Sequence, residues 1–161
     1  LSNGKLRIVK VVQQKGYNIK LTIVGDGELT DELISLAEVL QIRDFSLLKF
    51  QKNIENIYQM ADIFCLTSNW EGSPNVLLEA MSAGLPVVAF DCPTGPKEVL
   101  SDEVNGFLVE LNDQVMFADR LIQLIESENL RSSLGNAARK SMQKNRAARI
   151  SKKWSAIIDG L

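Results

Sequence analysis

The chain contains 161 residues, of which 45% are hydrophobic and 24% are charged, which is typical of one folded domain rather than a disordered segment. It contains no histidine, which excludes a Ser-His-Asp triad, a Cys-His pair and any histidine-ligated zinc site. The net charge is −2, and the apolar runs are too short to span a bilayer. The two cysteines, Cys65 and Cys92, lie in or beside apolar runs, so we expect buried thiols and a reducing, cytoplasmic location.

Helices and strands are predicted to alternate along the chain. Leu6, Val9 and Val12 recur at helical spacing, whereas Ile19, Leu21 and Ile23 alternate as in a strand. In chain order, we predict a helix over 5–14, a strand over 19–24, a helix from about 28, a strand over 45–50, a helix over 54–60, a strand over 63–66, a helix over 74–83, strands over 86–90 and 106–109, and helices from 114 onward.

Short apolar strands separated by helices indicate a parallel sheet that is covered by helices on both faces. The expected fold class is therefore α/β, a Rossmann-like, doubly wound domain. We expect one domain over residues 1–161, in which residues 126–161 form the C-terminal helices.

Ligands of such sheets bind at the carboxyl ends of the strands, in the loops that lead into helices. Gly25 and Gly27 follow one strand like the start of a dinucleotide fingerprint, but Thr30 occupies the place of the third glycine. We expect these glycines to permit a sharp turn, with nicotinamide binding as the weaker alternative.

The loop and helix over residues 67–81 combine polar residues, an acid and a helix start. Ser73 and Pro74 are residue types that favour the N-cap and the first helical position. The free N–H groups of a first helical turn bind phosphate, assisted by the helix dipole. Gly72 lets a ligand approach the backbone without a Cβ in the way. This loop therefore predicts a phosphate-binding site.

Two acids flank that helix start. Glu79 lies among apolar residues of the helix and shares a face with Asn75. Because burying a carboxylate there is costly unless it is hydrogen-bonded, Glu79 is a candidate acceptor for the two hydroxyls of a ribose. The alternatives are a partly exposed glutamate on a polar stripe of the helix and, for Glu71, an ordinary loop acid.

The spacing Glu71-x7-Glu79, inside residues 68–89, closely resembles the E-x7-E signature of retaining glycosyltransferases of family 4, which have the two-domain GT-B fold. The resemblance covers residues 5–125. It implies that the chain is the C-terminal, donor-binding domain of such an enzyme. The enzyme would transfer a hexosyl or N-acetylhexosaminyl group from a nucleotide diphosphate sugar to a glycan or lipid-linked acceptor in polysaccharide and cell-envelope synthesis. Residues 92–96 resemble bacterial members that use uridine diphosphate (UDP) donors.

The resemblance also implies residue roles. Glu79 would hold the ribose, the backbone at 75–77 would bind the diphosphate, and Glu71 would act as an electrostatic group at an oxocarbenium-like centre. No cofactor or metal is implied, because the helix dipole and basic side chains neutralise the leaving diphosphate. The implied site comprises the catalytic Glu71 and the donor-binding Gly72, Ser73, Asn75, Val76, Leu77 and Glu79, with Gln51 and Lys52 near the base.

The chain departs from the family at its start. Members carry an Arg and a Lys, in and just after the first strand of this domain, that grip the diphosphate. Here residues 5–10 are predicted to be helical, so Arg7 and Lys10 are not assigned that role. We expect the sheet to lack its first strand and the acceptor-binding N-terminal domain to be absent, so that the chain alone binds donor weakly and transfers nothing.

Charge is distributed unevenly. Residues 1–130 carry 10 Lys and Arg against 19 Asp and Glu, whereas residues 131–161 carry eight basic residues against Asp159 alone. We expect these basic residues to form the solvated face of the terminal helices. The alternative is a peripheral contact of residues 131–153 with an anionic membrane. No nucleic acid is expected, because the rest of the chain is acidic and only Trp154 interleaves the basic residues as an aromatic.

Two other functions stay open. One is a non-catalytic module of the same fold that serves assembly or membrane docking, although intact Glu71 and Glu79 argue against it. The other is a sugar phosphorylase of the same architecture. A nucleotide-sugar epimerase of this architecture would need a histidine in the site, and the chain has none.

Overall fold

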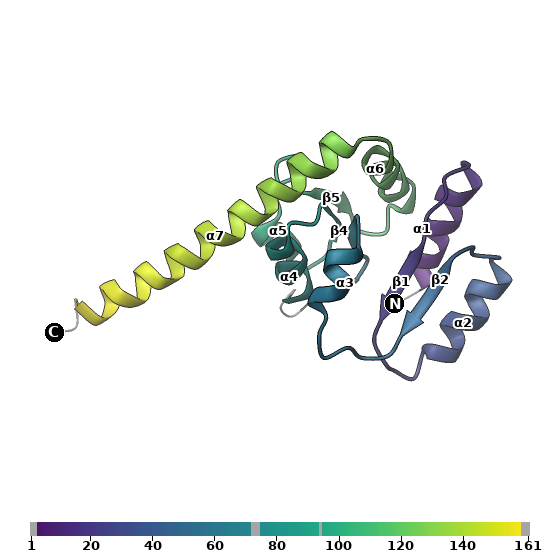
Figure 1. Cartoon of the computed structure of the whole chain (residues 1–161), viewed down its shortest axis with the longest axis horizontal. Helices are drawn as coiled ribbons and strands as arrows, with labels where there is room; N and C mark the ends of the chain where they lie inside the picture. The colour runs from purple at the N-terminus through teal and green to yellow at the C-terminus, as the bar shows by residue number, and fades with distance from the viewer. Residues whose placement is uncertain (1–2, 72–74, 94, 159–161) are drawn as a thin grey trace.

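The computed structural model describes residues 3–71, 75–93 and 95–158, and helices alternate with strands through most of them (Figure 1). The helices are α1 (Asn3–Gln14), α2 (Thr30–Val39), α3 (Glu55–Met60), α4 (Asn75–Ala83), α5 (Pro96–Val99), α6 (Gln114–Glu126) and α7 (Glu128–Ile158). The strands are β1 (Leu21–Val24), β2 (Phe45–Leu48), β3 (Phe64–Leu66), β4 (Val87–Asp91) and β5 (Phe107–Glu110). The predicted α/β fold is confirmed.

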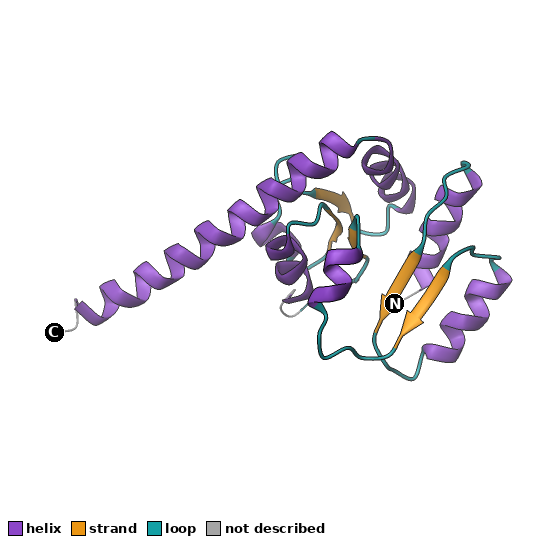
Figure 2. Cartoon of the chain, viewed as in Figure 1, coloured by secondary structure: helices purple, strands orange, loops and turns teal. Residues whose placement is uncertain are grey.

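All strand pairs are parallel, but the described strands form two sheets (Figure 2). β1 pairs with β2, with Leu21 opposite Phe45, and the second sheet has the order β3-β4-β5. Within the described ranges no ladder joins β1 to β3, and both strands are only partly buried. This split fits the expectation that the sheet lacks its first strand.

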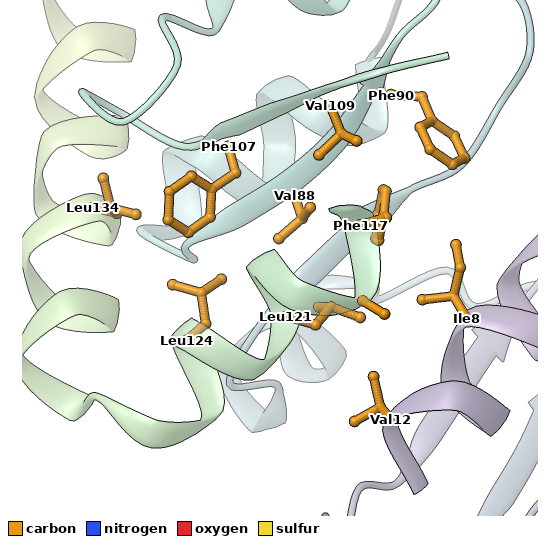
Figure 3. Packing of buried hydrophobic residues seen from close by; sticks show 11 residues of the cluster. Ile8, Val12, Val88, Phe90, Phe107, Val109, Phe117, Leu121, Leu124 and Leu134 are labelled. Atoms are coloured by element: carbon orange, nitrogen blue, oxygen red, sulfur yellow. The ribbon is translucent and has the colours of Figure 1, made fainter. Parts of the chain in front are cut away.

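Helix α1 packs against both halves of the molecule. Ile8 and Val12 belong to the main core cluster, which also contains residues of β4, β5, α6 and α7 (Figure 3). Leu6 packs instead with Leu33 and other residues around α2. The amide of the buried Gln13 exchanges two hydrogen bonds with the backbone of Arg43, at 2.8 and 3.1 Å. These contacts hold the two sheets together.

Helix α4 lies beside β3 and β4 and buries Leu77 and Met81 among them. It ends as predicted, since Gly84 adopts a φ of +86° just beyond it. The N–H groups of Gly84 and Leu85 donate to the last turn, at 3.0 and 3.1 Å. The predicted start at Ser73 and Pro74 lies outside the described residues.

Several predicted boundaries are wrong by a few residues. β1 begins at Leu21 rather than Ile19 because the ladder with β2 begins there, and β2 ends at Leu48 rather than Phe50. The short helix α5 was not predicted, since its four residues are too few to show a period. The C-terminal helices are α6 and α7, which meet at Ser127. Helix α7 projects far beyond the body of the domain (Figure 1).

Candidate functional site

The candidate site lies at the carboxyl ends of β3 and β4. The two strands are parallel and in register, with Leu66 opposite Ala89, so both end at the same edge. The chain leaves β3 through Thr67, passes Glu71 and enters α4 at Asn75. The predicted strand–loop–helix arrangement around the two acids is confirmed, and this is the edge where open α/β sheets bind ligands.

Glu71 is partly buried and shares its surroundings with Lys5 from α1 and Cys92 from the end of β4. Burial lowers the pKa of Lys5, and electrostatic interactions with the acidic groups of Cys65 and Glu71 partly offset that effect. Burial raises the pKa of Cys92, and the negative charge of Glu71 raises it further. The charge of Glu71 therefore acts on a basic side chain and on a neutral thiol that come from two different parts of the fold.

The expectation of two buried thiols holds for Cys92, which is fully buried, and only in part for Cys65, which is partly exposed. Both cysteines are free. Burial raises the pKa of Cys65 to about 12, although the positive charge of Lys5 opposes this rise. Both side chains are therefore neutral near pH 7.

Two buried oxygen atoms at this edge make no hydrogen bond within the described parts of the chain. They are Thr67 Oγ1, at the end of β3, and Asp91 Oδ1, at the end of β4. Asp91 Oδ1 lies 4.0 Å from Lys97 Nζ, an ion-pair distance that is too long for a hydrogen bond. A buried polar atom without a partner costs about 1–3 kcal/mol. Such atoms suit an edge that receives a polar ligand.

Glu79 is solvent-exposed on α4, and one of its oxygens, Oε2, accepts a hydrogen bond of 3.0 Å from the hydroxyl of Tyr58. An exposed Glu79 is compatible with the alternative of a glutamate on a polar stripe of the helix, and its role toward a ribose stays a prediction. The carboxylate is held by a neighbouring helix and remains accessible to a ligand.

The remaining donor-binding candidates lie in different surroundings. Asn75 and Val76 are exposed in the first turn of α4, whereas the side chain of Leu77 is buried in the core, so Leu77 has only its backbone to offer. Gln51 and Lys52 are exposed in the loop after β2, where Gln51 Nε2 donates to the carbonyl of Lys49 at 2.9 Å. No contact between described residues brings these two side chains to Glu71 or Glu79. Gly72 and Ser73 lie outside the described residues.

The sequence reasoning missed two residues of this edge, Lys5 and Tyr58, and it included Thr67 in the predicted loop 67–81 without giving it a role of its own. Tyr58 and Glu79 are 21 positions apart, and Lys5 and Glu71 are 66 apart. Helical periodicity over 54–60 places Tyr58 on the inner face of its helix but says nothing about its hydroxyl. Thr67 had a visible signal, since it is a polar residue directly after a buried apolar strand.

The described residues also form two surface hollows, and both lie away from this edge. They are near residues 10–14 and 34–47, around the ends of α1 and α2. Among the described residues there is no group of three potential metal-ligating side chains. No described helix combines the length and the apolar character needed to cross a membrane.

Residues 5–141 match the family described as "Glycosyl transferases group 1". Because this match covers most of the chain, the chain belongs to that family. The resemblance inferred from Glu71-x7-Glu79 is confirmed.

Curated relatives agree with this assignment. The chain is 36% identical over 155 residues to the amylovoran biosynthesis glycosyltransferase AmsD of Erwinia amylovora, covering 96% of this chain and 43% of that protein. It is 31% identical over 142 residues to a Campylobacter jejuni α-1,4-N-acetyl-D-galactosaminyltransferase whose name gives a diphosphoundecaprenol-linked glycan as its substrate, covering 88% of this chain and 39% of that protein. The chain thus spans less than half the length of these relatives.

Solved structures show the same fold. The crystal structure of TarM superposes with a TM-score of 0.89 at 27% identity, covering 96% of this chain and 32% of that one. A TarM variant from S. aureus, solved with UDP and a GlcNAc-glycerol, gives the same score, identity and coverage. The fold of this chain therefore corresponds to part of the larger TarM chain.

Proposed function

We propose that this chain is the donor-binding domain of a retaining glycosyltransferase. The enzyme transfers a hexosyl or N-acetylhexosaminyl group from a UDP-sugar to a glycan or lipid-linked acceptor in cell-envelope polysaccharide synthesis. The observation that carries the proposal is the placement of Glu71 and Glu79 on either side of the start of α4, at the carboxyl edge of a parallel sheet. The family match, the relatives' names and the UDP-bound TarM variant support it.

Different residues at this edge would bind different parts of the donor. The first turn of α4, at Asn75 and Val76, offers backbone N–H groups and the positive end of a helix dipole to the diphosphate. The exposed carboxylate of Glu79 accepts hydrogen bonds from the ribose hydroxyls. Glu71 stabilises positive charge that develops on the transferred sugar as the diphosphate leaves. The acceptor then attacks from the same face, which gives retention.

Several parts of the proposal rest on the resemblance alone. Gly72 and Ser73 would contact the sugar, and Gln51 and Lys52 would meet the base. The reaction would use no metal and no cofactor. The acceptor would bind to a separate N-terminal domain. Because residues 5–10 are helical and do not supply the Arg and Lys that grip the diphosphate in the family, the 161 residues alone would bind donor weakly and, without an acceptor site, would transfer nothing.

We further propose a peripheral contact with anionic membrane through the basic segment 131–153. Two basic residues of this segment make contacts within the fold, since Arg131 Nη1 donates to the carbonyls of Leu124 and Ile125, and Arg139 donates to that of Ala83. These two arginines hold α7 to the body. The remaining basic residues of the segment are Lys140, Lys144, Arg146, Arg149, Lys152 and Lys153.

A nuclear magnetic resonance titration tests both proposals on one isotopically labelled sample. Adding UDP should shift the amide signals of Asn75, Val76 and Leu77 first, because their N–H groups would meet the diphosphate. In a separate arm, vesicles containing phosphatidylglycerol should broaden signals from 140–153, whereas vesicles of phosphatidylcholine alone should not.

The two arms have separate negative outcomes. UDP that leaves residues 75–77 unchanged at millimolar concentration contradicts the donor site. Vesicles of either composition that leave 140–153 unchanged contradict the membrane contact. Vesicle effects without any nucleotide effect favour the alternative of a docking module.

A further inference from the structure

The contact between Tyr58 and Glu79 joins two helices that are distant in the sequence. The hydroxyl of Tyr58, on α3, lies 3.0 Å from Glu79 Oε2 and 3.4 Å from the carbonyl oxygen of Val76, both on α4. A hydroxyl has one proton to donate, and the shorter distance, to a carboxylate, identifies its main acceptor. Tyr58 therefore donates to Glu79 at the turn of α4 that follows the proposed diphosphate site.

The ring of Tyr58 is held firmly. Only 8% of the residue is exposed, and it packs in a cluster with Ala80 and Leu85. The ring also meets Phe64 of β3 edge-on, with 6.1 Å between the ring centroids. The hydroxyl is thus a fixed point at the end of a buried ring, whereas Glu79, on the exposed face of α4, has a flexible side chain with several staggered rotamers.

Burial and the hydrogen bond to Glu79 raise the pKa of Tyr58. The hydroxyl consequently keeps its proton across the pH range in which proteins work, and it remains a hydrogen-bond donor there. A carboxylate has two oxygens and about four acceptor positions, so one bond from Tyr58 leaves capacity for further hydroxyl groups.

We propose that Tyr58 is a positioning residue that orients the Glu79 carboxylate to accept the ribose hydroxyls of the donor. This inference rests on the proposed function, because it needs a ribose at Glu79. Fixing one long side chain in advance removes part of the entropy that binding would otherwise lose, so the contact strengthens recognition of the ribose in particular. It should have no direct effect on recognition of the base or the diphosphate.

The test compares two nucleotides in the full-length protein that contains this chain. UDP carries both ribose hydroxyls, and 2′,3′-dideoxyuridine diphosphate carries neither. Dissociation constants are measured by calorimetry for the unmodified protein and for Tyr58→Phe, which keeps the buried ring and removes the hydroxyl. We expect Tyr58→Phe to weaken UDP binding about three- to tenfold and dideoxy binding less than about twofold, the change that loss of one hydrogen bond produces.

A matched control exists within the same chain. Tyr17, a half-buried residue, also donates a hydrogen bond from its hydroxyl to a glutamate, Glu126, but this bond is solvent-exposed and lies on α6. Tyr17→Phe should leave both dissociation constants unchanged. Glu79→Gln should reduce the discrimination between the two nucleotides, and adding Tyr58→Phe to Glu79→Gln should reduce it no further.

The outcomes separate this inference from the function on which it rests. If Tyr58→Phe weakens the binding of both nucleotides equally, the tyrosine is merely structural and the inference is overturned. An unchanged affinity for both nucleotides overturns it as well. If Glu79→Gln keeps the full discrimination, the ribose role of Glu79 itself is wrong. If Glu79→Gln loses the discrimination between the two nucleotides while Tyr58→Phe keeps it, the ribose role of Glu79 stands and only the positioning role of Tyr58 is wrong.

Discussion

Glu71 and Glu79 are the same residue type eight positions apart, but they lie in different surroundings. Glu71 is partly buried, near Lys5 and the neutral thiol of Cys92. Glu79 is exposed and accepts a hydrogen bond from Tyr58. A partly buried charge acts on its neighbours through a lower effective dielectric than an exposed one. The geometry therefore favours Glu71 for stabilising positive charge on the transferred sugar and Glu79 for binding the ribose.

This difference predicts different kinetics for the two variants in the full-length protein. Glu71→Gln should lower kcat about 100-fold or more with little change in the nucleotide dissociation constant, because an electrostatic group acts mainly on the transition state. Glu79→Gln should weaken nucleotide binding about tenfold, as expected for a hydrogen bond to a charged group. Steady-state kinetics and calorimetry measure the two effects. Identical profiles for the two variants would contradict the assigned roles.

The contact between α7 and the end of α4 sets the position of the C-terminal helix. Gly135 is buried on α7, and a Cβ there would overlap the carbonyl oxygen of Gly84. Arg139, one turn further along, donates to the carbonyl of Ala83. Buried Leu134 and Ala138 contribute to two core clusters on either side of this crossing. The close approach of the two backbones thus requires glycine at position 135.

Gly135→Ala should therefore destabilise the protein by about 1–3 kcal/mol, even though alanine is the better helix former. Asn136→Ala is the matched control, because it changes the next residue of α7 to alanine on an exposed face and should be neutral or slightly stabilising. Urea unfolding followed by circular dichroism gives both free energies. A Gly135→Ala protein as stable as the control would show that the backbones do not meet.

At the scale of the whole molecule, the space between β1 and β3 is the main departure from a complete doubly wound sheet. Both strands expose apolar side chains in part, including Ile23, Val24 and Phe64. Helix α1 packs across both sheets and leads directly to β1. When a helix such as α1 connects two parallel strands of the same sheet, the connection is nearly always right-handed. A parallel strand directly ahead of α1 would fit between β1 and β3.

Hydrogen exchange tests this expectation. In the 161-residue chain, the amides of β4 should exchange most slowly, because its Val87, Val88 and Ala89 are fully buried and it pairs on both sides. Amides of β1 and β3 should exchange faster. In a longer protein with residues ahead of Leu1, exchange at β1 and β3 should slow about tenfold or more. Equal exchange in both proteins would mean that no strand is added there.

The sequence by itself determined the α/β class, the order of the elements apart from the short α5, the end of α4 at Gly84 and the position of Glu71 and Glu79 around its start. These depend on local patterns, namely apolar spacing, turn residues and a motif within 20 residues. The roles of all the candidate site residues, Glu71 and Glu79 included, stay predictions. Only the tertiary structure decided that Tyr58 meets Glu79, that Lys5 lies near Glu71 and that β1 and β3 do not pair. Those contacts join residues distant in the chain, and the packing of whole helices and strands brings them together.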